Sequence, residues 1–127
     1  MSGWIGVDLD GTLAEYRGWT KDGSIGKPIP IMVNRVKKWI ADGRDVRIFT
    51  ARCWPLGTAA QIGIECAIDS SAQVHRIEEW CVKHIGHALP VTCVKDYGMV
   101  ELWDDRAVQV RANTGLRADG ENTDICL

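Results

Sequence analysis

The stretch WIGVDLDGTL, residues 4–13, decides the fold that this chain is expected to adopt. Its first four residues are apolar, and Asp8 and Asp10 stand where the apolar run ends. A near-continuous apolar run is typical of a strand in a parallel sheet that is covered on both faces. Gly11 follows at once and permits a tight turn and a close approach of the backbone to a ligand. The stretch therefore predicts a buried first strand with two carboxylates at its carboxyl end.

Strands and helices are expected to alternate along the rest of the chain. Apolar residues at helical spacing predict helices over 29–40 and 70–85, and apolar runs predict further strands at 45–50, 90–94, 99–103 and 108–110. This alternation favours a parallel sheet with helices on both faces. The predicted fold class is α/β, a Rossmann-like three-layer sandwich around a mainly parallel central sheet of about five strands.

Length and composition fit one globular domain. The 127 residues carry a formal net charge of −2, which implies no general attraction to nucleic acid or to an anionic membrane. We expect the domain to cover residues 1–112, followed by a polar tail over 113–127 that has little periodicity and is expected to be frayed. No apolar stretch approaches the ~20 residues of a membrane span, so no membrane partner is expected.

The cysteines favour a reducing compartment. There are 5 of them, and no two have the C-x-x-C spacing of a metal or redox site. The first residues also lack the basic and apolar regions of a signal peptide. Reduced thiols and a cytoplasmic location are therefore expected.

Aspartate, threonine and lysine residues follow the predicted strands, at the edge where open parallel sheets bind ligands. They are Asp8 and Asp10 after the first strand, Thr50 after the second, Lys95 after the third, and Asp104 and Asp105 after the fourth. Converging carboxylates repel one another unless a cation lies among them, and hard oxygen ligands suit Mg²⁺. One carboxylate can attack phosphorus and a second can transfer protons. Hydroxyl and ammonium groups can stabilise a phosphoryl group during transfer.

The same residues resemble a known family. DLDGTL, residues 8–13, is similar to the D-x-D-G-T-L signature of the haloacid dehalogenase superfamily of phosphatases. IFTAR, residues 48–52, resembles the second motif of that family, Lys95 the third, and LWDDR, residues 102–106, the acidic fourth. The four motifs occur in the order of the family and cover roughly residues 4–110.

This resemblance implies a magnesium-dependent phosphomonoesterase that acts through an aspartyl-phosphate. Asp8 is then the nucleophile, Asp10 the general acid and base, and Thr50 and Lys95 the groups that hold the phosphoryl group. The implied metal ligands are Asp8, Asp10 through its backbone carbonyl, Asp104 and Asp105; the last aligns best as the inner-sphere ligand, although the division within that pair stays open. The expected substrate-binding residues are Gly11, Thr12, Ala51 and Arg52.

The gaps between the motifs leave the substrate open. Residues 14–28 suit a short flap and residues 52–69 a loop, so no cap domain is expected and the chain resembles the capless subgroup. Whether either segment closes over the site is not decided by the sequence. An open site often serves macromolecular ends or borrows a neighbouring subunit, so the partner is a phosphorylated small molecule or a phosphorylated nucleic-acid end, and a homo-oligomer is compatible. TAR at 50–52 and DDR at 104–106 are also similar to the phosphatase half of polynucleotide kinase/phosphatase.

Two other classes of protein share some of these residues. A receiver-like signalling module also combines acidic residues, a hydroxyl, a lysine and Mg²⁺, but its phospho-acceptor aspartate ends a later, central strand, where this chain has Thr50. An inactive binding protein is disfavoured because Asp8 and Asp10 are both present. Singly, each motif residue is ordinary: Asp10-Gly11 as a turn, Thr50 as a helix cap, Lys95 as a surface residue and Arg52 as an exposed loop residue. The interpretation as a phosphatase depends on all of these residues occurring together in the order of the family motifs.

Overall fold

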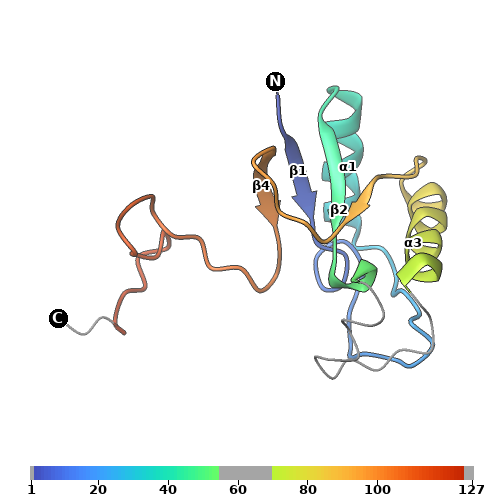
Figure 1. Ribbon diagram of the computed structural model, residues 1–127, viewed down its shortest axis with the longest axis horizontal. Coiled ribbons are helices and arrows are strands. Elements are labelled where there is room, and N and C mark those ends of the chain that lie inside the picture. The colour runs from blue at the N-terminus through green and yellow to red at the C-terminus, as the bar shows by residue number, and fades with distance from the viewer. Residues whose placement is uncertain (1, 55–69, 125–127) are drawn as a thin grey trace.

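The computed structural model describes residues 2–54 and 70–124. The elements in chain order are β1 (Trp4–Val7), α1 (Pro30–Ala41), β2 (Asp45–Phe49), the 3₁₀ turn η1 (Ala51–Cys53), α3 (Ser70–His84), β3 (Val91–Thr92) and β4 (Met99–Trp103). Within the described residues, the strands form a 4-stranded, all-parallel sheet in the order β3-β2-β1-β4 (Figure 1). The α/β class and the parallel sheet expected from the sequence are confirmed.

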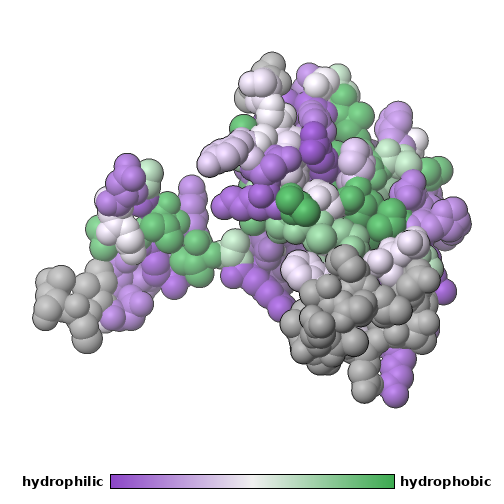
Figure 2. Space-filling view, viewed as in Figure 1, coloured by the Kyte–Doolittle hydropathy of each residue, from purple (hydrophilic) through white to green (hydrophobic). Residues whose placement is uncertain are grey.

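The strand expected over residues 108–110 does not join the sheet. Val110 makes an isolated antiparallel bridge with Arg117, inside a local turn of the segment that follows β4. This segment projects away from the sheet (Figures 1 and 2), and Val108 and Val110 are about half exposed on it. The sheet of the described residues therefore has four strands instead of about five. A run of three alternating residues satisfies a local turn as well as a strand, so its pattern could not separate the two.

The helices α1 and α3 pack on one face of the sheet. The register pairs Ile5 with Val46 and Val7 with Ile48, so these buried side chains of β1 and β2 point to the same side. A single apolar cluster joins them to buried residues of the two helices, namely Met32, Val33 and Val36 of α1 and Ile77, Trp80 and Cys81 of α3. The helical layer on this face is thus formed by α1 and α3 together.

The opposite face carries side chains of the sheet itself. Trp4 is 2% exposed there, and the Arg47 guanidinium lies 4.7 Å from the centre of a Trp4 ring. Phe49 stacks on the same tryptophan at 6.5 Å between ring centres. No helix among residues 2–54 and 70–124 covers this face, so the expected three layers are reduced to two in the described part of the chain.

The ends of α1 follow from its sequence. Pro30 occupies its first turn, where a fixed φ suits the helix and a missing N–H costs nothing. Gly43 comes directly after the C-terminal cap residue and has φ +80°, the left-handed conformation that glycine adopts without strain. None of the helices in the described ranges is both long enough and apolar enough to cross a membrane.

The segment between β1 and α1 forms a flap, residues 15–28, whose base is paired. Ala14 bridges Pro28 in antiparallel fashion, and the Glu15 amide donates to the Lys27 carbonyl at 2.8 Å. Before the flap, the amides of Thr12, Leu13 and Ala14 all donate to the Leu9 carbonyl, so the chain turns tightly after β1. The expected flap is confirmed in this form.

Replacing Ile77 by alanine is expected to lower the free energy of unfolding by about 2–5 kcal/mol, because its fully buried side chain joins α3 to the sheet. Val82, which is 54% exposed on the same helix, is the matched control, and its change to alanine should cost no more than about 0.5 kcal/mol. Urea unfolding followed by circular dichroism measures both variants. Equal losses would contradict the packing of α3 through Ile77.

Candidate active site

The parallel sheet brings three carboxylates to one edge. Asp8 follows β1, while Asp104 and Asp105 follow the neighbouring strand β4. The Asp8 amide donates to the Trp103 carbonyl at 2.9 Å, so the pairing of the two strands continues up to the site. Each of the three aspartates offers a carboxylate oxygen, and these oxygens lie within 4.8 Å of one another. We call this set the acidic cluster; Asp8 and Asp104 are half-buried in it and Asp105 is exposed.

The turn after β1 holds Asp105 in place. Thr12 Oγ1 accepts the Asp105 amide at 3.0 Å and lies 3.3 Å from Asp105 Oδ1, to which it donates. Gly11 has φ +91°, and a Cβ at this position would lie 2.5 Å from Asp105 Oδ2. Gly11 and Thr12 were expected to bind substrate, and in the structure they contact a member of the acidic cluster. A glycine is needed here because the carboxylate occupies the space of a side chain.

Asp8 lies in an electrostatic environment that disfavours its charge. Burial, and then the Asp104 charge, the hydrogen bond and charge of Asp105, and the Asp10 charge, raise the pKa of Asp8 from 3.8 to about 7. Each of these causes raises the pKa, and none of them is a basic side chain. A cluster of hard oxygen donors fits a divalent cation such as Mg²⁺, which would offset the repulsion among the carboxylates.

Asp10 lies in the opposite environment. Its two carboxylate oxygens accept from Arg52 Nε at 2.7 Å and from Arg52 Nη2 at 2.8 Å, a bidentate ion pair. The Arg52 side chain is 4% exposed and that of Asp10 19%. The Asp10 carboxylate is therefore not part of the acidic cluster. Its backbone carbonyl stays a predicted metal ligand.

Arg52 uses all of its donors inside the chain. Besides Asp10, it donates to the Gly23 carbonyl, to the Ser24 carbonyl at 3.1 Å and to Gln73 Oε1 at 3.1 Å. A guanidinium has five N–H donors, and the bonds to these acceptors and to both Asp10 oxygens account for each of them. The expected substrate-binding arginine is thus a buried residue whose partners are the flap, α3 and Asp10.

Sequence reasoning missed these partners of Arg52. The sequence signal for Gln73 was its position four residues before Ile77, which puts a polar residue on the apolar side of α3; in the structure its side chain is 2% exposed. The acceptors from the flap are main-chain carbonyls, which any residue could supply and which therefore leave no trace in the sequence.

Thr50 is buried beside the site, whereas Lys95 is exposed. Thr50 is 4% exposed at the end of β2, the strand next to β1, and its Oγ1 accepts the Arg52 amide at 3.2 Å. Ala51 is exposed at the start of η1. Lys95 is exposed in the segment between β3 and β4, and it forms no ion pair with any described residue. The structure thus brings Asp8, Asp104 and Asp105 together, and Lys95 forms no ion pair with any of them.

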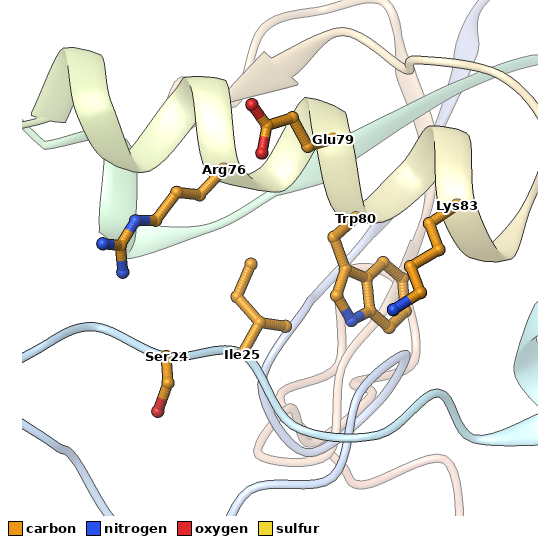
Figure 3. Close-up of a pocket in the computed structure, with 6 residues that line it drawn as sticks. All are labelled: Ser24, Ile25, Arg76, Glu79, Trp80 and Lys83. Carbon is orange, nitrogen blue, oxygen red and sulfur yellow. The ribbon is translucent and has the colours of Figure 1, made fainter.

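A cleft of about 330 Å³ lies between the flap and α3 (Figure 3). It is lined by Ser24, Ile25, Arg76, Glu79, Trp80 and Lys83. None of the acidic cluster lines it. Ser24 connects the cleft to the site, because its carbonyl also accepts from Arg52.

Comparisons of this chain with protein-family models, with curated proteins and with solved structures give no match.

The stability of the metal-free protein is expected to fall as pH rises from about 4 to about 7. Because the pKa of Asp8 is raised from 3.8 to about 7, the folded protein keeps a proton across this interval that the unfolded chain has released. This contribution is complete below the unfolded pKa and is lost as pH rises through the folded one. Urea unfolding in a chelator, at several pH values, measures the trend.

The control for this pH dependence is Asp8→Asn, which cannot titrate. Its stability should fall less over the same interval, and saturating Mg²⁺ should remove the fall in the unchanged protein because the cation replaces the proton. An identical pH dependence in both proteins would contradict the environment described for Asp8.

Replacing Gly11 by alanine is expected to weaken Mg²⁺ binding, because the new Cβ would displace the Asp105 carboxylate. Gly43→Ala is the matched control: Gly43 also has a positive φ, of +80°, but has no atom within 4 Å of the Cβ position. Both variants should lose about 1–2 kcal/mol of unfolding free energy from backbone strain. Only Gly11→Ala should raise the Kd for Mg²⁺, by about tenfold or more, in a calorimetric titration. Equal Mg²⁺ affinities would contradict the role given to Gly11.

Proposed function

We propose that this protein is a magnesium-dependent phosphomonoesterase that acts through an aspartyl-phosphate on Asp8. The observation that carries the proposal is the acidic cluster, in which Asp8, Asp104 and Asp105 meet within 4.8 Å at the carboxyl edge of a parallel sheet. Asp10, two residues after Asp8, is held apart by an arginine and is available for a different task. Bound Mg²⁺ would keep the Asp8 carboxylate ionised, as a nucleophile must be, so the proposed division of roles depends on the cation.

The proposed reaction has two steps that share Asp8 and Asp10. First, an Asp8 oxygen attacks phosphorus, the bond to the ester oxygen breaks, and that oxygen takes a proton from the Asp10 carboxyl group. Then a water attacks phosphorus, Asp10 takes a proton from this water, and the Asp8 carboxylate leaves. The sum is a phosphate monoester and water converted to an alcohol and inorganic phosphate.

The cation and the phosphoryl group are proposed to lie over the carboxyl edge. The acidic cluster would hold Mg²⁺, with the Asp10 carbonyl as the further ligand that the motif resemblance implies. When bound, Mg²⁺ neutralises the cluster and the oxygens of the phosphoryl group. Thr50, buried at the end of β2, would donate its hydroxyl to a phosphoryl oxygen. Lys95 stays the predicted second donor, although its side chain is exposed and forms no ion pair with the described residues.

We propose a likeness to the capless haloacid dehalogenase phosphatases on the strength of the four ordered motifs. The substrate class is either a phosphorylated small molecule or a phosphorylated nucleic-acid end. A receiver-like module is less well supported, because the inner strands β1 and β2 are followed directly by Asp8 and Thr50, so that Thr50 stands where a receiver has its acceptor aspartate. Residues 55–69, most of the loop expected after the second motif, lie outside the described residues.

A cytoplasmic setting is part of the proposal. Cys53, Cys81 and Cys93 are free thiols in the described part of the chain. Burial raises the pKa of the Cys81 thiol to about 11, which suits an inert core residue. Cys66 and Cys126 lie outside the described residues.

Asp8→Asn is expected to reduce Mg²⁺-dependent hydrolysis of an aryl phosphate by about a thousandfold or more, since it removes the nucleophile while keeping the shape. Asp42→Asn is the matched control, because Asp42 lies on the exposed C-terminal end of α1 and pairs only with exposed Lys38. Its turnover should equal that of the unchanged protein. Phosphate release, measured with and without a chelator, gives both values.

Unchanged turnover in Asp8→Asn would refute the assignment of the nucleophile. A long-lived phospho-protein without turnover would instead support the receiver-like module. A parallel screen of phosphometabolites and phosphorylated oligonucleotides identifies the substrate class, and activity on the oligonucleotides that falls steeply with salt would support the nucleic-acid end.

A further inference from the structure

Arg52 is the one described residue that contacts Asp10, the flap and α3 together. It forms the bidentate pair with Asp10, donates to the carbonyls of Gly23 and Ser24, and donates to Gln73. Its guanidinium also lies 4.9 Å from the centre of a Trp19 ring, so the flap covers it from a further side. With 4% of its side chain exposed, Arg52 has little access to solvent.

The flap is docked by donors from α3 as well. Arg76 Nη1 donates to the Asp22 carbonyl at 2.6 Å, and Trp80 Nε1 donates to the Gly26 carbonyl at 3.1 Å. Neither of these bonds reaches Asp10. The Arg52 bonds are therefore the direct polar link between the docked flap and the proposed acid–base residue.

We infer that Arg52 is a positioning residue that couples docking of the flap to the orientation of Asp10. The inference rests on the proposed phosphomonoesterase function. A carboxyl group has about four lone-pair sites, so Asp10 can accept the fork of Arg52 at two of them and use another to give a proton to the leaving oxygen and then, as the carboxylate, to take one from water. When the flap is docked, the Gly23 and Ser24 carbonyls fix the guanidinium, and the guanidinium in turn fixes both Asp10 oxygens. When the flap moves off, the guanidinium loses these acceptors and the Trp19 face, and Asp10 loses its orientation.

A planar fork is required for this coupling. Lysine keeps the positive charge but has no second nitrogen to bind the second Asp10 oxygen, and it lacks the donors that reach the flap carbonyls at the same time. Arg52→Lys therefore separates positioning from charge. A residue that only stabilised the fold would affect all substrates equally, whereas a residue that positions Asp10 should matter most where the leaving oxygen needs a proton.

The test compares two phosphate monoesters in single-turnover kinetics with Mg²⁺. 4-Nitrophenyl phosphate releases a stable phenolate that needs no proton, and phenethyl phosphate releases an alkoxide that does. In Arg52→Lys, the first turnover of phenethyl phosphate should fall by about a hundredfold or more, while that of 4-nitrophenyl phosphate should fall by no more than about threefold. An equal fall for both esters would overturn the positioning role.

A second variant tests the contact between the flap and Arg52. Trp19→Leu removes the ring over Arg52 without touching the Asp10 pair and should reduce phenethyl phosphate turnover selectively, by about tenfold. Tyr16→Leu is the matched control, since Tyr16 and Trp19 are both flap aromatics with 39% exposure and no contact joins Tyr16 to Arg52 among the described residues. Trp19→Leu kinetics equal to those of Tyr16→Leu would overturn the link to the flap.

Hydrogen exchange separates this inference from the proposed function. Asp10→Asn weakens the ion pair at the site end, so the amides of residues 22–26 should exchange faster, although Asp10 has no hydrogen bond to the flap. Asp8→Asn should leave their exchange unchanged. If the unchanged protein hydrolyses neither ester, the proposed function fails, and the exchange result alone then decides the coupling. Unchanged flap exchange in Asp10→Asn would overturn it.

Discussion

The pairing of β1 with β4 is the constraint on which the site depends. It ends in the hydrogen bond from the Asp8 amide to the Trp103 carbonyl, so the next residues of both chains leave the sheet side by side. Because Asp104 and Asp105 are those next residues, main-chain geometry forces their carboxylates against Asp8. Burial raises the pKa of Asp8 most, and the charges of Asp104 and Asp105, which this constraint brings near, raise it further. A proton or a cation would offset the repulsion.

The turn after β1 adds a second layer to the same arrangement. Gly11 lets the backbone pass within contact distance of Asp105, and the Thr12 hydroxyl donates to the Asp105 carboxylate and accepts the Asp105 amide. Two residues of the first motif thus serve the carboxylates of the fourth. Asp10, on the same turn, pairs with the Arg52 guanidinium. One short turn therefore provides two carboxylate environments, one crowded by negative charge and one paired with positive charge.

The sequence predicted that the first strand is covered on both faces. The face of the sheet without a described helix shows how this prediction can hold. Trp4 folds over its neighbour Gly6, where a Cβ would lie 3.2 Å from the indole and 2.9 Å from the Met99 methyl group. Asp96, in the segment between β3 and β4, accepts the Trp4 indole N–H at 2.8 Å and anchors the ring. An apolar residue on this face is buried by side chains of the sheet and by a connecting segment, without a helix. The sequence predicted that the strand is buried, but it did not predict that side chains of the sheet and a connecting segment bury it.

The sequence by itself determined the parallel α/β sheet, the paired flap and the edge at which the acidic residues gather. The spacing and type of the residues predict these features, because an apolar run, a glycine or an aspartate has its effect at its own position in the chain. Only the tertiary structure decided that Arg52 is buried on Asp10 and the flap, that Lys95 stays exposed, and that residues 108–110 remain outside the sheet. These outcomes depend on main-chain carbonyls and on which strand edge lies within reach. Such groups are the same in every residue, so they exist as partners only once the chain has folded.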